Sequence, residues 1–152
     1  NRLRDSGRWN RSLVVIVPDH YGCWPQNLPT MPERHHIPLV ITGGALEGAV
    51  PAQVDTPSTQ ADIAATLLGL LGLDAGRFPF SRDLLSGRPV PPIAIFTESG
   101  GLCAVTPEGF VELDPDANRV TAVSGLDGTA AADAADRARA WLQTLYGYID
   151  RL

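Results

Sequence analysis

The stretch that decides the fold reads Leu13-Val14-Val15-Ile16-Val17-Pro18-Asp19-His20-Tyr21-Gly22. Five aliphatic residues in a row, four of them β-branched, predict a strand buried on both faces, as in a parallel sheet. An ionisable pair directly after such a strand lies where open α/β sheets place their ligand crevice. We therefore expect Asp19 and His20 at the mouth of a site, with Gly22 allowing the chain to turn sharply.

This ionisable pair has two interpretations. Asp19 offers a carboxylate oxygen and His20 an imidazole nitrogen, which are ligands suited to a divalent metal. In the simpler interpretation, Asp19 caps a turn and His20 packs locally. Two-residue motifs match by chance often, so the downstream sequence has to decide between the two.

Composition restricts the class of protein. The chain has 152 residues, enough for one domain with a real core, and its 44% hydrophobic and 19% charged residues are typical of a folded protein. A net charge of -5 without a basic cluster argues against a nucleic-acid partner or an anionic membrane surface. The sequence contains neither a signal peptide nor an apolar run near the roughly 20 residues that span a bilayer. It begins at Asn1 without Met, and we expect it to be a segment of something longer.

The first half predicts an α/β arrangement. A helix stopped at Gly7 precedes the first strand, and residues 21–32 predict an exposed loop. A second strand is expected over residues 37–42, closed by Gly43-Gly44. The clearest helix is expected to begin with Thr56 as N-cap and Pro57 at its first position, and to end at Gly72. Its predicted buried face consists of Ile63, Leu67, Leu70 and Leu71.

The second half predicts short strands and one long helix. Segments 93–97, 102–105, 110–113 and 119–123 are separated by turns, and their spacing indicates an antiparallel meander. An amphipathic helix begins near Ala130, and its buried side is predicted to be Ala138, Trp141, Leu142, Leu145 and Ile149. We expect residues 1–90 and 91–152 to be two parts that pack as one unit.

Three blocks in order carry a resemblance to a known family. Together they resemble the carboxyl-terminal part of the sulfatase-like branch of the alkaline phosphatase superfamily, most closely its lipoteichoic-acid-synthase type of phosphoglycerol transferase. Residues 78–85, Phe-Pro-Phe-Ser-Arg-Asp-Leu-Leu, resemble the family's segment after its helix. The blocks are residues 14–22, Arg34-His35-His36-Ile37-Pro38-Leu39, and Ser58-Thr59-Gln60-Ala61-Asp62-Ile63-Ala64-Ala65-Thr66-Leu67-Leu68 ending in Leu71-Gly72-Leu73.

The resemblance implies a fold and a chemistry. It implies an alkaline-phosphatase-like mixed sheet in residues 1–90, with helices on both faces and a divalent metal (Mn, Zn, Mg or Ca) held by Asp19 and His20. The substrate would be a phosphate or sulfate ester, possibly linked to a lipid or glycan. The nucleophile (Thr, Ser or formylglycine) and an acidic ligand would lie upstream, so we expect no turnover from this segment alone. The parent would be anchored by upstream membrane helices and act outside the cytoplasm, at the cell envelope.

Two residues of the second block are candidate substrate contacts. His36 stands immediately before the second strand, from where it would reach the metal or an oxyanion of the substrate; the alternative is packing at the strand edge with a backbone partner. Arg34 is a candidate contact for an anionic head group, although a lone surface Arg usually has no such role. We interpret His35 as solvated, Asp62 as stabilising the amino end of its helix, and Tyr21 as lining the site or covering the core.

The cysteines do not decide between a sulfatase and a phosphoglycerol transferase. Cys23 and Cys103 permit one disulfide but do not establish an oxidising compartment. Residues 23–27 superficially match the Cys-x-Pro-x-Arg signature of classical sulfatases, but Asn27 replaces the Arg, and we treat the match as a decoy. A true sulfatase therefore stays an alternative to a phosphoglycerol transferase. A non-enzymatic alternative is a degenerate domain that binds envelope glycan or a partner protein.

Overall fold

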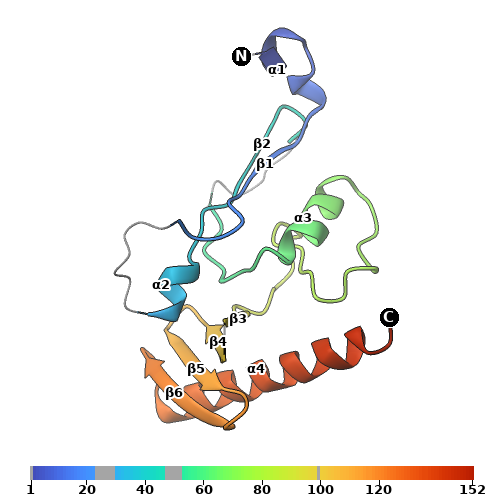
Figure 1. Ribbon diagram of the computed structural model, residues 1–152. Coiled ribbons are helices and arrows are strands. Elements are labelled where there is room, and N and C mark those ends of the chain that lie inside the picture. Colours follow the sequence, from blue (N-terminus) through green and yellow to red (C-terminus); the bar gives the residue numbers. More distant parts are fainter. Residues whose placement is uncertain (1, 23–29, 47–52, 99) are drawn as a thin grey trace.

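The described residues form two antiparallel sheets, a two-stranded ribbon from the first half of the chain and a four-stranded sheet from the second (Figure 1). The computed structural model describes residues 2–22, 30–46, 53–98 and 100–152. The predicted α/β class, with a small antiparallel sheet and a terminal helix in the second half, is confirmed. Contacts across the predicted boundary at residue 90 include Arg82 with the carbonyl of Ile93 and Arg34 with Glu98.

The opening strand differs from its prediction. Strand β1 (Val14–Ile16) pairs antiparallel with β2 (Val40–Thr42), with Val15 opposite Ile41. Ile16 is 59% exposed, so the prediction of a strand buried on both faces of a parallel sheet is wrong for these residues. A strand is buried in that way only when other strands flank it and helices cover both faces, and among the described residues β1 has β2 as its one partner. Figure 1 shows the ribbon extending away from the four-stranded sheet.

Gly43 closes the ribbon, as the sequence predicts. Its φ is +124°, and an added Cβ would collide with the backbone carbonyl of Ser12. The residue after β2 must therefore be glycine for the chain to pass this close to the start of β1. On the amino-terminal side, helix α1 (Arg2–Asp5) is followed by Gly7 at φ +68°, which confirms the predicted stop, and by the short helix η1 (Trp9–Arg11).

A helix replaces part of the predicted loop. Helix α2 (Met31–His35) begins with a capping box, in which the Thr30 side chain accepts from the Glu33 amide and the Glu33 carboxylate accepts from the Thr30 amide. The sequence signal was present in Thr30-Met31-Pro32-Glu33, because a Thr with Glu three residues later and an early Pro is typical of a helix start. The Met31 amide also donates to Glu112 of the four-stranded sheet at 3.1 Å, which fixes α2 on that sheet.

Helix α3 (Asp62–Leu70) begins later than predicted. Thr56 is not its N-cap; residues 59–62 form a turn in which the Asp62 carboxylate accepts from the Thr59 amide at 2.9 Å. The predicted end is confirmed, since Gly72 has φ +67° and the amide of Leu73 donates to the carbonyl of Leu68 at 2.8 Å, as in a Schellman motif. The buried face of α3 also differs from the predicted one. Leu71, predicted to be buried, is 57% exposed, and the buried residues of the helix are Asp62, Ala65 and Thr66.

The meander and the terminal helix follow the sequence closely. The strands lie in the order β3-β4-β5-β6, all antiparallel, and their bounds are β3 Ala94–Glu98, β4 Gly101–Val105, β5 Phe110–Asp114 and β6 Arg119–Ser124. Helix α4 (Gly128–Ile149), capped by Asp127, covers one face (Figure 1). Small alanines let the helix approach the sheet, and the core joins Leu102, Ala104, Val111 and Leu113 to Ala134, Ala135 and Ala138.

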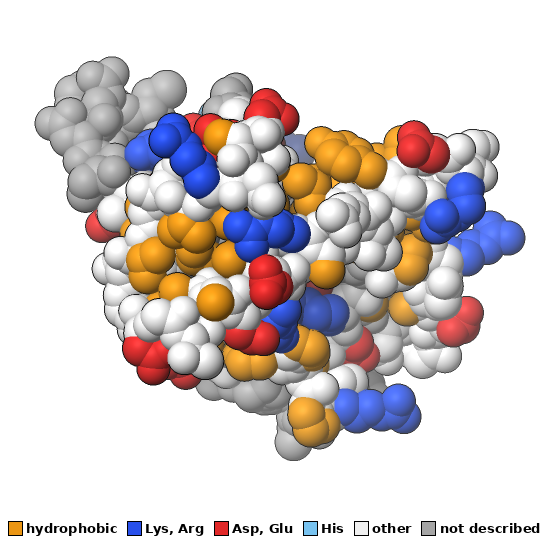
Figure 2. Space-filling view, turned by 90° about the horizontal axis from the view of Figure 1, so that it is seen from below, with side chains coloured by type: hydrophobic (Ala, Val, Ile, Leu, Met, Phe, Trp, Pro, Cys, Tyr) orange, Lys and Arg blue, Asp and Glu red, His pale blue; other side chains and the backbone are white. Residues whose placement is uncertain are grey.

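The last turns of α4 depart from the predicted apolar side. Ala138 is buried, Trp141, Leu142 and Leu145 are half-buried, and Ile149 is 52% exposed. The helix is longer than the sheet is wide, so its end extends past the strands (Figure 1). There Phe80 makes edge contacts with the rings of Trp141 and Tyr148. Figure 2, the view from below, shows acidic and basic side chains interspersed with apolar patches on this face.

Candidate metal site

Asp19 and His20 lie together just beyond the end of β1. Both side chains are largely exposed, 88% for Asp19 and 73% for His20, and Nε2 of His20 is 3.6 Å from Oδ2 of Asp19. The other carboxylate oxygen of Asp19 accepts from the backbone amide of His20 at 3.0 Å. The two side chains therefore converge on one another at the surface, and neither is sealed in an apolar interior.

The hydrogen bonds of the His20 ring leave one nitrogen for a ligand. Nδ1 lies 2.6 Å from the carbonyl oxygen of Tyr21. A carbonyl only accepts, so in the neutral ring the proton is on Nδ1 and the lone pair is on Nε2. Metal-binding histidines commonly donate their other ring nitrogen to such a partner, which fixes the tautomer.

The geometry of the pair fits a divalent cation. Ligands about 2.0–2.2 Å from a tetrahedral ion lie about 3.4 Å from one another, which is close to the observed separation of Nε2 and Oδ2. A tight site needs more than two protein ligands. Within the described ranges, no group of three or more His, Cys, Asp or Glu side chains is placed to hold a metal.

Gln60 joins the Asp-His segment to the turn before α3. Its side-chain amide nitrogen donates to the carbonyl oxygens of Pro18 at 2.8 Å and Asp19 at 3.1 Å. Gln60 lies within the helix predicted from Thr56 to Gly72, and its sequence context assigns it no role. The block 58–62 named the residue, but a contact across 41 residues has no local sequence signal.

Asp62 holds that turn in place. It is 1% exposed, and its carboxylate accepts from the Thr59 amide, the Arg82 amide and the Arg82 guanidinium, whose NH2 group lies 2.6 Å away. Its place in the first turn of α3 agrees with the predicted stabilisation of the helix start. Arg82 was missed, although it stands in the quoted segment 78–85. Its guanidinium also donates to the carbonyls of Pro57, Pro91 and Ile93.

The other predicted site residues lie around α2. His36 follows the helix as its C-cap and is exposed, and among the described residues no hydrogen bond or ion pair joins it to Asp19 or His20. Arg34 forms an ion pair with Glu98 at 3.1 Å.

His35 is exposed, as predicted, but its ring also stacks on Phe96, with centroids 4.5 Å apart, and its Nδ1 lies 2.9 Å from the Met31 carbonyl. Tyr21 is half-buried and contributes its carbonyl to His20.

Cys103 is not available as a ligand. It is a free, fully buried thiol on β4, and burial, followed by the nearby charge of Glu112, raises its pKa to about 12. A metal needs the thiolate, so Cys103 stays a neutral core residue at physiological pH. Cys23, and with it the predicted disulfide and the decoy motif 23–27, lies outside the described residues.

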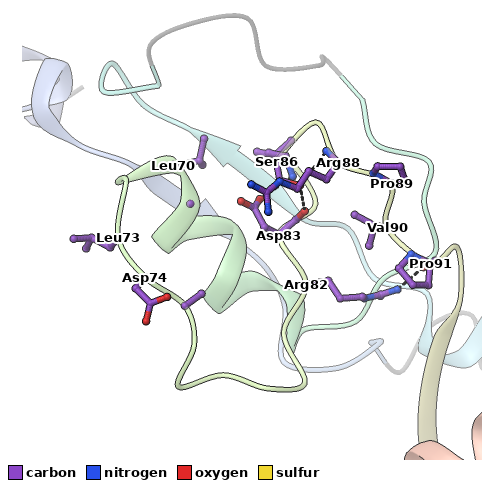
Figure 3. Close-up of a pocket in the computed structure, with 13 residues that line it drawn as sticks. Leu70, Leu73, Asp74, Arg82, Asp83, Ser86, Arg88, Pro89, Val90 and Pro91 are labelled. Atoms are coloured by element: carbon purple, nitrogen blue, oxygen red, sulfur yellow. Dashed lines mark hydrogen bonds between the residues drawn. The ribbon is translucent and has the colours of Figure 1, made fainter.

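A hollow of about 870 Å³ lies on another side of α3 (Figure 3). It is open and polar, and its walls include Asp74, Arg82, Asp83, Ser86 and Arg88. Asp83 lies over Gly69, where an added Cβ would collide with its carboxylate. Asp19 and His20 do not line this hollow, and both side chains are largely exposed.

Comparisons with known proteins support the resemblance to the alkaline phosphatase superfamily. No family model matches the chain. It is 28% identical over 105 residues to the lipoteichoic acid synthase-like YvgJ of Bacillus subtilis, covering 59% of this chain and 17% of that protein. It is 38% identical over 64 residues to a phosphopentomutase of Carboxydothermus hydrogenoformans, covering 42% of this chain and 16% of that protein.

The fold matches a solved structure over most of the chain. A protein in the alkaline phosphatase superfamily from Vibrio parahaemolyticus superposes with a TM-score of 0.61 at 21% identity, over 91% of this chain and 37% of that one. The chain thus spans well under half the length of each of these three proteins. No helix in the described part of the chain has the length and apolar character of a membrane span.

Proposed function

We propose that this chain is part of a metal-dependent enzyme of the alkaline phosphatase superfamily that hydrolyses or transfers phosphate or sulfate esters. The observation that carries the proposal is the convergence of Nε2 of His20 and Oδ2 of Asp19, 3.6 Å apart. The partial matches to a lipoteichoic acid synthase-like protein and a phosphopentomutase support action on phosphate esters.

In the proposed site, each residue of the pair has a distinct role. Asp19 supplies negative charge through Oδ2, while its Oδ1 is engaged by the His20 amide. His20 supplies the Nε2 lone pair, with the ring held by its bond to the Tyr21 carbonyl. A bound divalent cation would neutralise the oxygens of the ester in transfer and lower the pKa of a coordinated nucleophile.

The rest of the machinery is proposed to lie outside the described residues. Two protein ligands hold a cation loosely, and the described residues contain no cluster of three metal-binding side chains. We therefore expect the 152-residue chain alone to show no turnover. His36 and Arg34 stay proposed substrate contacts, His36 through its exposed ring and Arg34 only if its ion pair with Glu98 opens.

The likeness to a lipoteichoic acid synthase-like protein favours a lipid- or glycan-linked phosphate ester as substrate. The same likeness supports a membrane-anchored parent that acts on the outer side of the membrane. A sulfate ester is the alternative substrate within this proposal.

The test measures ester turnover by a longer natural protein that carries this chain and by the 152-residue chain alone. Bis-(p-nitrophenyl) phosphate, p-nitrophenyl phosphate and p-nitrophenyl sulfate are each offered with and without Mn²⁺ or Zn²⁺. We expect metal-dependent turnover of one ester by the longer protein, and a loss of about 100-fold in Asp19→Ala or His20→Ala.

Turnover that survives both substitutions would overturn the role of the pair. His20-dependent turnover by the 152-residue chain would overturn its proposed inactivity. Absence of turnover from the longer protein with all three esters and both metals would favour the degenerate, glycan- or protein-binding alternative.

A further inference from the structure

We propose that Gln60 is a positioning residue that holds the Asp19–His20 pair in its ligand-ready arrangement; this inference rests on the proposed metal role of the pair. The Gln60 amide nitrogen donates to two consecutive carbonyls, 2.8 Å from Pro18 and 3.1 Å from Asp19. A primary amide has two N–H groups, so one side chain fixes both peptide units that lead into His20.

The Asp-His segment has little else to hold it. It lies past the end of β1, and the hydrogen bonds formed by the side chains of Asp19 and His20 stay within residues 19–21. Among the described residues, Gln60 is the donor that joins residues 18–20 to another element. Because the two ligand atoms face solvent, packing does not fix their separation, and the carbonyl contacts from Gln60 restrain the backbone that carries them.

Gln60 is itself on a rigid support. The turn that carries it is closed by the bonds from the Asp62 amide to the Thr59 carbonyl and from the Thr59 amide to the Asp62 carboxylate. Asp62 is buried and held by Arg82, whose guanidinium also reaches Pro91 and Ile93. The restraint on the pair therefore extends from Gln60 into the part of the chain that precedes β3.

The test uses the 152-residue chain with Gln60→Met, which keeps the side-chain length and removes both donors. Gln143→Met, at an exposed position on α4, is the matched control. The first measurement needs no metal: ¹⁵N relaxation reports the order parameters of the amides of Asp19, His20 and Tyr21. The second titrates each protein with Mn²⁺ and follows the paramagnetic broadening of the His20 ring signals.

We expect order parameters of about 0.85 in the unsubstituted chain and in Gln143→Met, falling below about 0.6 in Gln60→Met. We also expect about tenfold weaker Mn²⁺ binding in Gln60→Met, with a melting temperature close to that of the unsubstituted chain. The melting temperature separates local loosening from failure to fold.

Unchanged order parameters in Gln60→Met would overturn the inference. A drop in order with unchanged Mn²⁺ affinity would also overturn it, because Gln60 would then be structural only. Both of these outcomes are seen in Gln60→Met and leave the metal role of the pair standing. The unsubstituted chain tests that metal role: if its order parameters are high but Mn²⁺ does not broaden the His20 signals, the metal role fails, and the positioning role fails with it.

Discussion

The guanidinium of Arg82 closes on the buried carboxylate of Asp62, with NH2 and Oδ2 2.6 Å apart and Asp62 only 1% exposed. This pair connects the turn before α3 to the segment that leads into β3. It is a tertiary contact between residues 20 apart in the first part of the chain, and the same guanidinium reaches the second part through the carbonyl of Ile93.

We predict that Arg82→Leu lowers the free energy of unfolding by about 3 kcal/mol, because it leaves a buried carboxylate without its charged partner. Urea unfolding followed by circular dichroism measures the loss. Arg139→Leu is the control: Arg139 pairs with the 79% exposed Asp136, and its loss should cost under about 0.5 kcal/mol. Equal losses in the free energy of unfolding would contradict this prediction, because the buried Arg82–Asp62 pair would then stabilise the fold no more than an exposed ion pair does.

Gly43→Ala should destabilise the β1–β2 ribbon. The residue has φ +124°, and its Cβ would meet the carbonyl of Ser12, so we expect a loss of more than about 2 kcal/mol. Gly87→Ala is the control: Gly87 has φ +69°, and an added Cβ would meet no neighbouring atom. Its substitution therefore measures the cost of a positive φ alone, which should be about 1 kcal/mol in the free energy of unfolding. Amide hydrogen exchange at Val15 and Ile41 reports the ribbon directly. Slow exchange preserved in Gly43→Ala would contradict the close approach.

The free energy of unfolding should fall as pH rises from about 9 towards 12 through Cys103. Its thiol has a pKa raised to about 12 in the folded chain, against 9.0 for the unfolded reference. Between these values the unfolded state loses a proton that the folded state keeps, so folding becomes less favourable with increasing pH. Urea unfolding at pH 8 and pH 10 measures the slope. In Cys103→Ala this slope should be smaller, and equal slopes would contradict the buried neutral thiol.

Local patterns predicted the second half of the chain well. The meander and α4 are joined by short turns, so strand order follows from neighbouring segments, and alternating burial in β5 matches its alternation of apolar and polar residues. The stops at Gly7 and Gly72 were also readable, because positive φ favours glycine.

The first half depends on contacts that no local pattern contains. Burial of Val14–Ile16 requires neighbours beyond β2, and the start of α3 is set by the carboxylate of Asp62 accepting from Thr59 and Arg82. Gln60 could not be assigned a role, since its partners Pro18 and Asp19 lie more than 40 residues earlier. Helix α2 is different: its capping box was visible in the sequence and was overlooked.

The most direct test of the account asks whether Asp19 and His20 bind one cation together. Electron paramagnetic resonance measures free Mn²⁺ in the presence of the 152-residue chain and of His20→Ala, Asp19→Asn and the doubly substituted chain. If the pair shares one ion, each single substitution should remove most of the specific binding, and the double substitution should add little. Mn²⁺ binding that is equal in all four proteins would contradict the metal role of the pair.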